Sequence, residues 1–344
     1  MSEPQGDFAA LLKRLAAGER LSATDSAEAF GAMMRGAVSE PRMAAFLTAL
    51  AVRGPSIEEI SGAAKAMRAA MTAVKAPPSA IDVCGTGGDG RGTLNVSTAV
   101  AFVVAGCGVP VAKHGNRAMS SRTGAADVLE SLGVPVTLDS NAAKQSLLRN
   151  NFVFLFAPAF HPAMKHVASV RRELGFRTLF NLLGPICNPA RVKRQLMGVF
   201  APEWLEPVAH VLKDLGAEKA FIVHGADGMD ELTTTGETSI AILDKGTVRL
   251  MRVSPEDAGL PSAPLSALKG GSAEDNAKAI RDLLNGKKSA FRDIVLLNAA
   301  AALMVAGKAS SFPEGVAQSE KSIDSGAARH VLEEAAATNV AAPT

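Results

Sequence analysis

The chain has 344 residues, of which 47% are hydrophobic and 20% charged, a balance typical of globular proteins and not of a mostly disordered chain. The sum of 36 basic and 34 acidic residues is a formal net charge of +2, which argues against a protein that coats nucleic acid or lies on a membrane surface. The chain has no tyrosine, which excludes chemistry that needs a phenol.

The first 75 residues have the pattern of helices only. Ser22 stands three residues before Asp25, and Ser56 three before Glu59, and each pair predicts a capping box at a helix start. A third helix is expected over residues 41–52. A stiff segment at residues 75–79, which contains two prolines, follows this helical region and predicts a domain boundary.

Short apolar runs alternate with helical stretches after this segment. The expected strands are residues 81–84, 109–112, 153–156, 220–224 and 240–243. The expected helices are residues 97–107, 125–132, 142–150, 202–215, 273–284 and 291–306. This order predicts an α/β fold with a small N-terminal all-helical domain, residues 1–75. A larger α/β domain, residues 76–344, has a central, mostly parallel sheet flanked by helices.

A soluble, cytoplasmic protein is expected. The opening residues have neither the basic segment nor the apolar core of a secretory signal. The longest apolar run, residues 99–112, is shorter than the roughly 20 residues that a bilayer span needs. Three cysteines, Cys84, Cys107 and Cys187, lie far apart without a C-x-x-C pair, which favours a reducing compartment over a disulfide framework or a zinc cluster.

A glycine-rich loop, Gly85-Thr-Gly-Gly-Asp-Gly90, follows the first expected strand. It contains G-x-G-x-x-G, but no helix follows at once and no acidic residue occurs over residues 90–126 to bind a ribose, so a dinucleotide site is not favoured. The glycines let main-chain amides approach an anion, and Asn95-Val-Ser-Thr98 adds hydroxyls at a helix start. The loop therefore predicts a phosphate site, the alternative being an ordinary turn and helix cap.

The second expected strand leads into Lys113-His-Gly-Asn-Arg-Ala-Met-Ser-Ser-Arg122, which contains three fixed cations and no acid. A cluster of unpaired cations after a buried strand favours an anionic ligand over a solvated charged face. His114 alone would be a weak indication, because a histidine can simply hydrogen-bond within a loop.

Two carboxylates, Asp230 and Glu231, follow a later strand. Alone they would indicate an exposed acidic turn. Together with a glycine loop and a cation cluster at neighbouring strand ends, they predict a site for a diphosphate and Mg²⁺, which prefers oxygen ligands and shares its shell with substrate phosphates.

Residues 161–175 predict one helix that ends at Gly175. Arg171 or Arg172 on it is either a plain surface cation or one that interacts favourably with the helix dipole. Either arginine could instead bind a substrate carboxylate with its planar guanidinium.

These segments, with residues 172–185, 223–231 and 292–301, closely resemble the anthranilate phosphoribosyltransferase family over nearly the whole chain. The resemblance implies a nucleoside phosphorylase/phosphoribosyltransferase-like fold. It also implies that parts of residues 162–185 join the helical domain in space, and that the protein is a homodimer. The implied reaction transfers the phosphoribosyl group of 5-phosphoribosyl 1-diphosphate to anthranilate, in tryptophan biosynthesis, with Mg²⁺. Small departures from the family pattern occur at Leu94 and at Ala159-Phe160.

The resemblance also implies roles for individual residues. Lys113, His114 and Arg171 are the expected catalytic residues, and Ser97, Asp230 and Glu231 the expected Mg²⁺ ligands. Anthranilate is expected at Gly85, Asn116 and Arg171. The expected donor site consists of Gly85, Gly88, Asp89, Thr93, Asn95, Val96, Ser97, Thr98, Lys113, His114, Gly115, Asn116, Arg117, Ala118, Met119, Ser120 and Ser121.

Two alternatives stay open. A pyrimidine nucleoside phosphorylase shares the architecture, but its phosphate loop resembles Lys-His-Ser, whereas Gly115-Asn116 follow Lys113-His114 here. A non-catalytic, nucleic-acid-binding relative would have a net basic surface and altered metal positions, and the net charge of +2 with Asp230 and Glu231 present argues against it.

Overall fold

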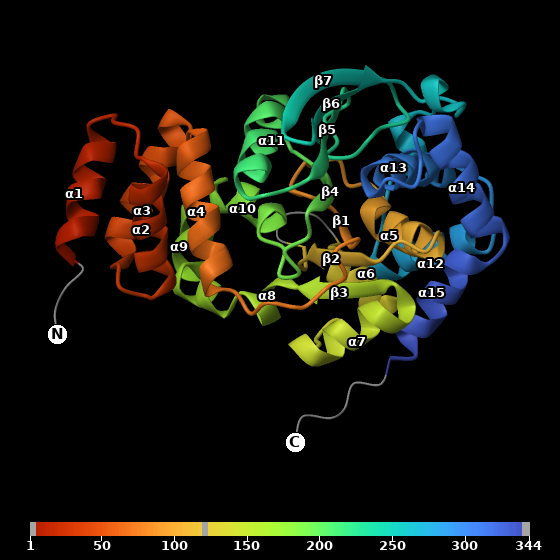
Figure 1. Ribbon diagram of the computed structural model, residues 1–344, viewed down its shortest axis with the longest axis horizontal. Helices are drawn as coiled ribbons and strands as arrows, with labels where there is room; N and C mark the ends of the chain where they lie inside the picture. The colour runs from red at the N-terminus through yellow and green to blue at the C-terminus, as the bar shows by residue number, and fades with distance from the viewer. Residues whose placement is uncertain (1–4, 119–122, 339–344) are drawn as a thin grey trace.

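The computed structural model describes residues 5–118 and 123–338. Its first part is four helices, which lie together at one end of the molecule in Figure 1: α1 (Gln5–Ala16), α2 (Ala23–Met34), α3 (Glu40–Arg53) and α4 (Ile57–Ala70). Both predicted capping boxes, Ser22 with Asp25 and Ser56 with Glu59, are confirmed. Lys75 lies between α4 and the first strand, and the domain boundary after it stays a prediction.

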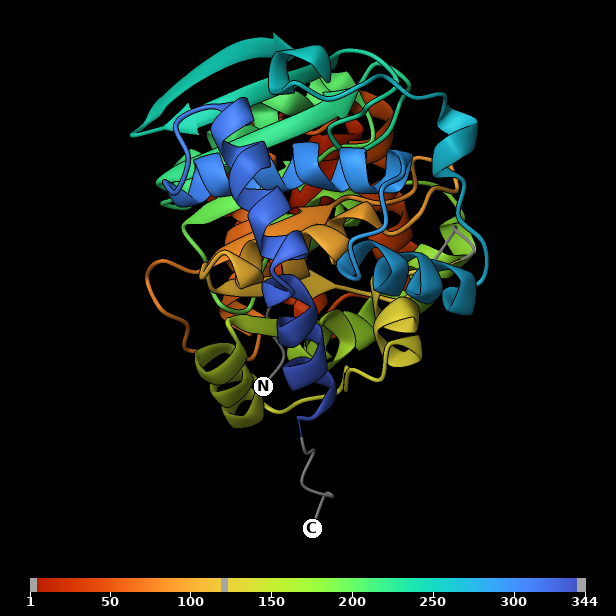
Figure 2. The same cartoon turned by 90° about the vertical axis from the view of Figure 1, so that its right-hand side faces the viewer.

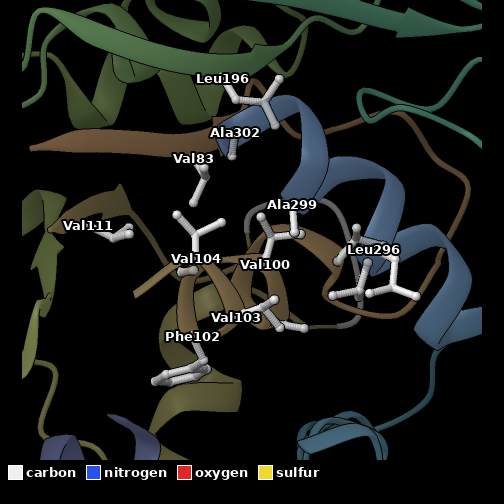
Figure 3. Packing of buried hydrophobic residues seen from close by; sticks show 14 of the residues in the cluster. Val83, Val100, Phe102, Val103, Val104, Val111, Leu196, Leu296, Ala299 and Ala302 are labelled. Carbon is white, nitrogen blue, oxygen red and sulfur yellow. The ribbon is translucent and has the colours of Figure 1, made fainter. Parts of the chain in front are cut away.

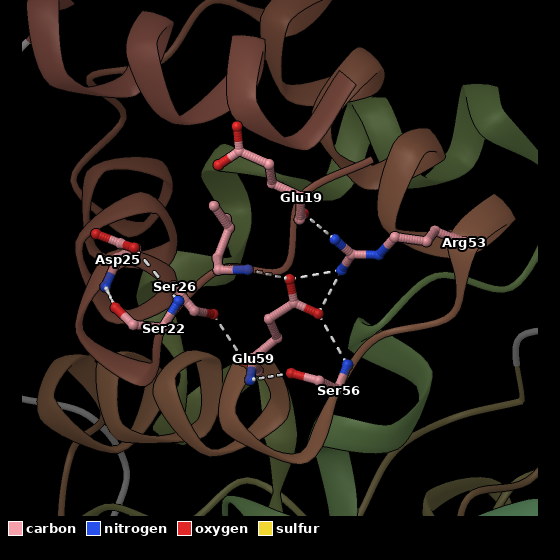
Figure 4. Close-up of polar contacts among 8 residues, drawn as sticks. Glu19, Ser22, Asp25, Ser26, Arg53, Ser56 and Glu59 are labelled. Atoms are coloured by element: carbon pink, nitrogen blue, oxygen red, sulfur yellow. Dashed lines mark hydrogen bonds and ion pairs between the residues drawn. The ribbon is translucent and has the colours of Figure 1, made fainter. Parts of the chain in front are cut away.

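Glu59 connects three segments of this helical region (Figure 4). Its buried carboxylate accepts hydrogen bonds from the main-chain amides of Leu21 and Ser56, both at 2.8 Å, and pairs with Arg53. Its carbonyl accepts from the hydroxyl of Ser26 at 2.7 Å. A buried charge with this many partners fixes how α2 and α4 pack, because breaking one contact leaves the rest of the network unsatisfied.

A seven-stranded sheet forms the centre of the rest, in the order β3-β2-β1-β4-β5-β6-β7. The pairs among the first five strands in that order are parallel, whereas β5–β6 and β6–β7 are antiparallel. The strands are β1 (Ile81–Gly85), β2 (Val111–Gly115), β3 (Phe152–Phe156), β4 (Arg194–Gly198), β5 (Lys219–Gly225), β6 (Thr238–Asp244) and β7 (Thr247–Val253). The predicted fold class is confirmed.

Two of these strands, β4 and β7, are not among the predicted ones. β4 begins with Arg194 and Gln195, polar residues that obscure a buried strand. β7 is an edge strand whose residues are mostly exposed, so it has no continuous apolar run. Periodicity alone therefore identifies only strands with a clearly apolar sequence.

The remaining helices cover both faces of the sheet. Figure 2 shows α13 and α14 on one face, where Figure 3 shows α5 and α13 packing against Val83 and Leu196. The other face packs on α11 and the helical region. These helices are α5 (Val96–Gly106), α6 (Ala125–Ser131), α7 (Ser140–Asn150), α8 (Ala157–Phe160), α9 (Ala168–Leu174), α10 (Phe180–Ile186), α11 (Leu205–Asp214), α12 (Ala273–Leu284), α13 (Ala290–Ala306), α14 (Phe312–Asp324) and α15 (Ala327–Ala336). Within residues 5–118 and 123–338, none of the helices has the length and apolar character that a membrane crossing needs.

The prediction of a single helix over residues 161–175 is wrong. A 3-10 helix, Pro162–His166, is followed by α9, and the break falls at Val167, whose φ of −115° is outside the helical range and whose side chain is fully buried. The predicted end at Gly175 is confirmed, with a left-handed φ of 64°. The segment from Val167 to Phe180 packs into the same core as the first four helices, and the rings of Phe30 and Phe180 lie 5.4 Å apart.

Candidate active site

The glycine loop after β1 contacts the carboxylate loop after β5. The amide of Gly87 donates a hydrogen bond to Oδ2 of Asp230 at 2.7 Å. A Cβ atom on Gly85 would lie 2.3 Å from that same oxygen, and one on Gly198, at the end of β4, would lie 1.6 Å from the carbonyl oxygen of Asp230. Glycine is therefore required at both strand ends, because any side chain would push Asp230 away.

The two carboxylates are enclosed. Asp230 is only 8% exposed and Glu231 is half-buried. Burial raises the pKa of both groups above its ordinary value, and neighbouring carboxylates, Asp89 for the first and Asp230 for the second, raise it further. Neither makes an ion pair with any of the described residues. The charge of Lys113 and the amide of Ser97 offset only part of this rise for Glu231, and the amide of Gly87 only part of it for Asp230. The negative charge that remains suits a cation.

Lys113, on β2, is a buried cation at the start of α5. Its side chain is 2% exposed, and Nζ donates to the carbonyl of Val83 at 2.7 Å and to the hydroxyl of Ser97 at 3.0 Å. Ser97 lies in the first turn of α5, whose first amides have no partner within the helix and favour negative charge. β2, α5 and the Asp230 loop thus bring the predicted cation, hydroxyl and carboxylates to one edge of the sheet.

The prediction that the cations after β2 are unpaired is wrong for Arg117. Its guanidinium hydrogen-bonds Glu130 at 2.5 Å and Asp127 at 2.9 Å. The acids lie on α6, which turns back over the loop, so a count of charges within the loop could not find them. The amide of Arg117 also donates to Oδ1 of Asn116 at 2.8 Å. The predicted donor residues Met119, Ser120 and Ser121, and Arg122, lie outside the described residues.

His114 is buried beside a second histidine. The two rings, those of His114 and His161, are 5.1 Å apart, and Nδ1 of His114 lies 2.9 Å from the carbonyl of Gly184. Burial lowers the pKa of His114 to about 3 and that of His161 to about 4, so both are neutral at pH 7. Neither Nε2 atom has a hydrogen-bond partner in the part of the chain that the structure describes.

A buried polar network underneath supports this histidine, and no sequence motif indicates it. Asp82 accepts a hydrogen bond from the amide of His114 at 3.2 Å and from Nδ2 of Asn188 at 2.8 Å. Gln195 donates from Nε2 to the carbonyl of Pro185 at 2.8 Å. Burial raises the pKa of Asp82 to about 6.

Arg171, on α9, is a partly buried cation without a carboxylate. Its Cζ lies 5.3 Å from the centre of the Phe180 ring. Burial lowers the pKa of Arg171, and among residues 5–118 and 123–338 no acceptor hydrogen-bonds its guanidinium. Its neighbour Arg172 is exposed. An unpaired, partly buried guanidinium suits a planar carboxylate.

The segment that carries Arg171 reaches the glycine loop through Arg177. That side chain donates to the carbonyl of Gly88 and stacks over the ring of Phe200, with 4.4 Å between Cζ and the ring centre. The structure therefore brings the segment predicted to bind anthranilate next to the loop predicted to bind the donor.

A third element near the site, residues 268–276, was not predicted to belong to it, although the start of the helix predicted over residues 273–284 lies within it. It supports the segment after the glycine loop through three hydrogen bonds of 2.8 to 3.0 Å. Two are between main-chain groups: the amide of Leu94 donates to the carbonyl of Leu268, and the amide of Gly270 donates to the carbonyl of Gly92. In the third, Nδ2 of Asn276 donates to Oδ1 of Asn95. Thr93 forms a bridge with Lys269. Asn95, the N-cap residue of α5, therefore bonds to Asn276 and makes no side-chain cap. These contacts join distant segments, mostly through the main chain, and the sequence has no signal for them.

The chain is similar to known proteins over nearly its whole length. Residues 77–329 match the a/b domain of a glycosyl transferase family, and residues 9–71 match the helical bundle domain of a glycosyl transferase family. The anthranilate phosphoribosyltransferases of Rhodopseudomonas palustris (strain HaA2) and Brucella suis biovar 1 are 53% and 52% identical. The matches cover 98% and 97% of this chain and 99% and 98% of the relatives.

The solved structures that the chain matches are of the same kind of enzyme. Anthranilate phosphoribosyltransferase from Thermus thermophilus matches with a TM-score of 0.91 and 46% identity, over 95% of this chain and 98% of that one. The enzyme from Saccharomyces cerevisiae, in complex with PRPP and Mg, matches with a TM-score of 0.89 and 30% identity, over 97% of this chain and 98% of that one. Identity at this level over nearly complete chains, on a shared fold, shows that the chain belongs to the anthranilate phosphoribosyltransferase family.

Proposed function

We propose that this chain transfers the phosphoribosyl group of 5-phosphoribosyl 1-diphosphate to anthranilate, in L-tryptophan biosynthesis. The products are N-(5-phosphoribosyl)anthranilate and diphosphate. The observation that carries the proposal is the 2.7 Å hydrogen bond between Gly87 and Asp230, which joins an anion-binding loop to a carboxylate pair. A diphosphate with its cation requires both at one place.

The donor would lie along the edge formed by the glycine loop, the start of α5 and the loop after β2. Main-chain amides of the glycines and of Ser97 and Thr98 would bind its phosphate oxygens. Gly85, Gly88, Asp89, Thr93, Asn95, Val96 and residues 113–121 complete the proposed donor site. Anthranilate would contact Gly85 and Asn116, with its carboxylate on Arg171.

The residues at the carboxylate pair fit a magnesium ion. We propose Ser97, Asp230 and Glu231 as its ligands. The described residues contain no group of three or more His, Cys, Asp or Glu that could hold a metal ion by itself. Two carboxylates and a hydroxyl suit Mg²⁺, which takes its other ligands from water and substrate phosphates. When bound, the ion would neutralise charge on the departing diphosphate.

The chain's own residues would assist the substitution as follows. The C1–oxygen bond to diphosphate breaks, and the anthranilate nitrogen forms the new bond to C1. Lys113, fixed by Val83 and Ser97, would stabilise the negative charge of the diphosphate, and Arg171 would orient the amine. His114 would accept the proton that the nitrogen loses. A hydrogen bond from Nδ1 to Gly184 leaves the Nε2 lone pair free, and a weak base suffices because an arylammonium ion is a strong acid.

The family resemblance supports two further proposals. The chain acts as a homodimer, which light scattering on the purified protein tests. It works in the cytoplasm, for which the free thiols of Cys84, Cys107 and Cys187 are suited.

The direct test is the fluorescence of anthranilate on mixing enzyme, phosphoribosyl diphosphate and Mg²⁺. Loss of fluorescence that needs all three components, and that stops on adding a chelator, is the expected result. Anthranilate and donor that both bind without any loss of fluorescence would refute the reaction. Turnover that is indifferent to the chelator would refute only the metal.

A further inference from the structure

Asn298 is a buried polar residue in an otherwise apolar helix. It lies on α13, is 0% exposed, and has Leu296, Leu297, Ala299 and Ala300 as buried neighbours in the chain. An amide in such surroundings costs free energy of desolvation unless it is hydrogen-bonded, and leucine would fill similar space without that cost. The proposed reaction gives Asn298 no direct role.

The side chain of Asn298 holds one peptide unit on each side of Leu232. Its Oδ1 accepts from the amide of Leu232 at 2.9 Å, and its Nδ2 donates to the carbonyl of Leu232 at 2.8 Å. The second Nδ2 hydrogen is donated to the carbonyl of Ile294 at 2.9 Å, one turn earlier on α13. Both amide hydrogens and the amide oxygen are therefore bonded, and the side chain is fixed in orientation.

Leu232 directly follows the carboxylate pair. The first member of the pair, Asp230, is fixed by the hydrogen bond from the amide of Gly87 and by the close approach of Gly85 and Gly198. Asp230 is thus held from the sheet, whereas the chain after Glu231 is held from α13. Glu231 itself makes no ion pair with the described residues. The main-chain amide of Ser97 and the charge of Lys113 act on its carboxylate from one side, and its direction depends otherwise on the main chain at both ends.

Asp227 closes the same loop on itself but does not attach it to α13. Its Oδ2 accepts from the hydroxyls of Thr233 and Thr235, both at 2.7 Å, and its Oδ1 from the amide of Met229 at 3.0 Å. The loop over residues 226–237 is therefore a unit with internal bonds. Asn298, on α13, attaches this unit to the core.

We propose that Asn298 is a positioning residue for the carboxylate pair. By holding Leu232 it sets the direction of Glu231 and thereby the affinity of the site for a divalent cation bound together with the donor. This role rests on the proposed function. It predicts that losing the two bonds to Leu232 weakens cation binding much more than it weakens anthranilate binding.

Two variants test the role. Asn298→Leu keeps the volume and removes all three hydrogen bonds, and Asn298→Ser keeps a polar group that is too short to bridge both groups of Leu232. Arg292→Leu is the matched control: Arg292 is 3% exposed on the same helix, but it bonds to Gly286 and Asp324 and does not contact the carboxylate loop. Should Asn298→Leu not fold, Asn298→Ser supplies the result.

Two readouts do not depend on turnover. Hydrogen–deuterium exchange of the peptide spanning residues 226–237, without metal or donor, should speed up at least about tenfold in both Asn298 variants and stay unchanged in Arg292→Leu. The dissociation constant of Mn²⁺, measured by electron paramagnetic resonance with phosphoribosyl diphosphate present, should rise at least about tenfold in the Asn298 variants alone. The KM for anthranilate should stay within about twofold.

The outcomes separate this proposal from the proposed function. Mn²⁺ that binds the wild-type protein and both Asn298 variants equally would overturn the positioning role and leave the function intact. An equal loss of Mn²⁺ affinity in Arg292→Leu would also overturn it, because the effect would then be general destabilisation. A wild-type protein that binds no Mn²⁺ in the presence of donor would overturn the proposed cation site, and this role with it.

Discussion

The two halves of the proposed active site are held in different ways. In the donor half, residues 85–98, 113–118 and 230–231, main-chain amides, close glycine contacts and buried polar side chains determine the position of each group. In the acceptor half, residues 171–178, Arg171 has an aromatic ring as its neighbour, and Phe176 is 45% exposed. The donor half is thus preorganised for a highly charged ligand, whereas Arg171 in the acceptor half has no acceptor among the described residues.

Gly198→Ala should break the donor half and has the largest expected effect. Its Cβ would lie 1.6 Å from the carbonyl oxygen of Asp230, so the carboxylate loop must shift by more than about an ångström. Such a displacement costs about a hundredfold or more in kcat/KM for the donor. Steady-state kinetics with varied donor measure it. Gly236→Ala, where no atom lies within 4 Å of the added Cβ, is the control and should retain activity. Near-normal kinetics of Gly198→Ala would mean that the carboxylate position is not critical.

Arg171→Ala should affect the acceptor half alone. Loss of a charge-assisted bond to the anthranilate carboxylate is worth about 1.5–3 kcal/mol, which raises the KM for anthranilate about ten- to a hundredfold. The KM for the donor should hardly change. Arg172→Ala, an exposed neighbour on the same helix, supplies the comparison and should behave as wild type. Equal losses for both substrates would contradict the division into two halves.

The smallest expected effect concerns the buried network below the donor half. Burial raises the pKa of Asp82 to about 6 in the folded protein, against 3.8 for the free carboxyl. Between these values the folded state binds more protons than the unfolded state, so the ionised form destabilises the fold and stability increases as the pH falls. Relative to Asp82→Asn, the wild-type free energy of unfolding should rise by about 1 kcal/mol from about pH 7 to pH 5.

Urea unfolding of both proteins at several pH values measures this difference. Other titrating groups, including the neutral His114 and His161, are common to both proteins and cancel in the comparison. If the free energy of unfolding of the wild type relative to Asp82→Asn instead fell as the pH decreased, Asp82 would be ionised and stabilised in the fold.

How much of this could be predicted depends on how local each feature is. The glycine loop, the start of α5 and the carboxylate pair are short motifs at strand ends, so the sequence indicates both the motifs and the edge of the sheet where they meet. The capping boxes at Ser22 and Ser56 are equally local, and both are confirmed.

Features that depend on distant segments could not be predicted. The sequence next to Arg117 contains no acid. Its partners, Asp127 and Glu130, come ten and thirteen residues later, on a helix that turns back over the loop. Asp82, Asn188 and Gln195 form a network only because the neighbouring strands β1 and β4 and the segment after α10 meet in the fold. Of Asn298, the sequence shows only a polar residue in an apolar helix, and its partner Leu232 becomes evident in the fold.

The packing of the helical region on later parts of the chain has a consequence for synthesis. The first four helices end at Ala70, but Phe180, whose ring packs on Phe30, is made more than a hundred residues later. At translation rates of about 5–20 residues per second this delay is about 5 to 20 s. The strands that complete the same core, with Ile222 and Leu243, are made later still. On the ribosome, α1–α4 must therefore wait with part of their apolar surface uncovered. In this protein, the helices α1–α4 are translated first, but their hydrophobic core is among the last to be completed.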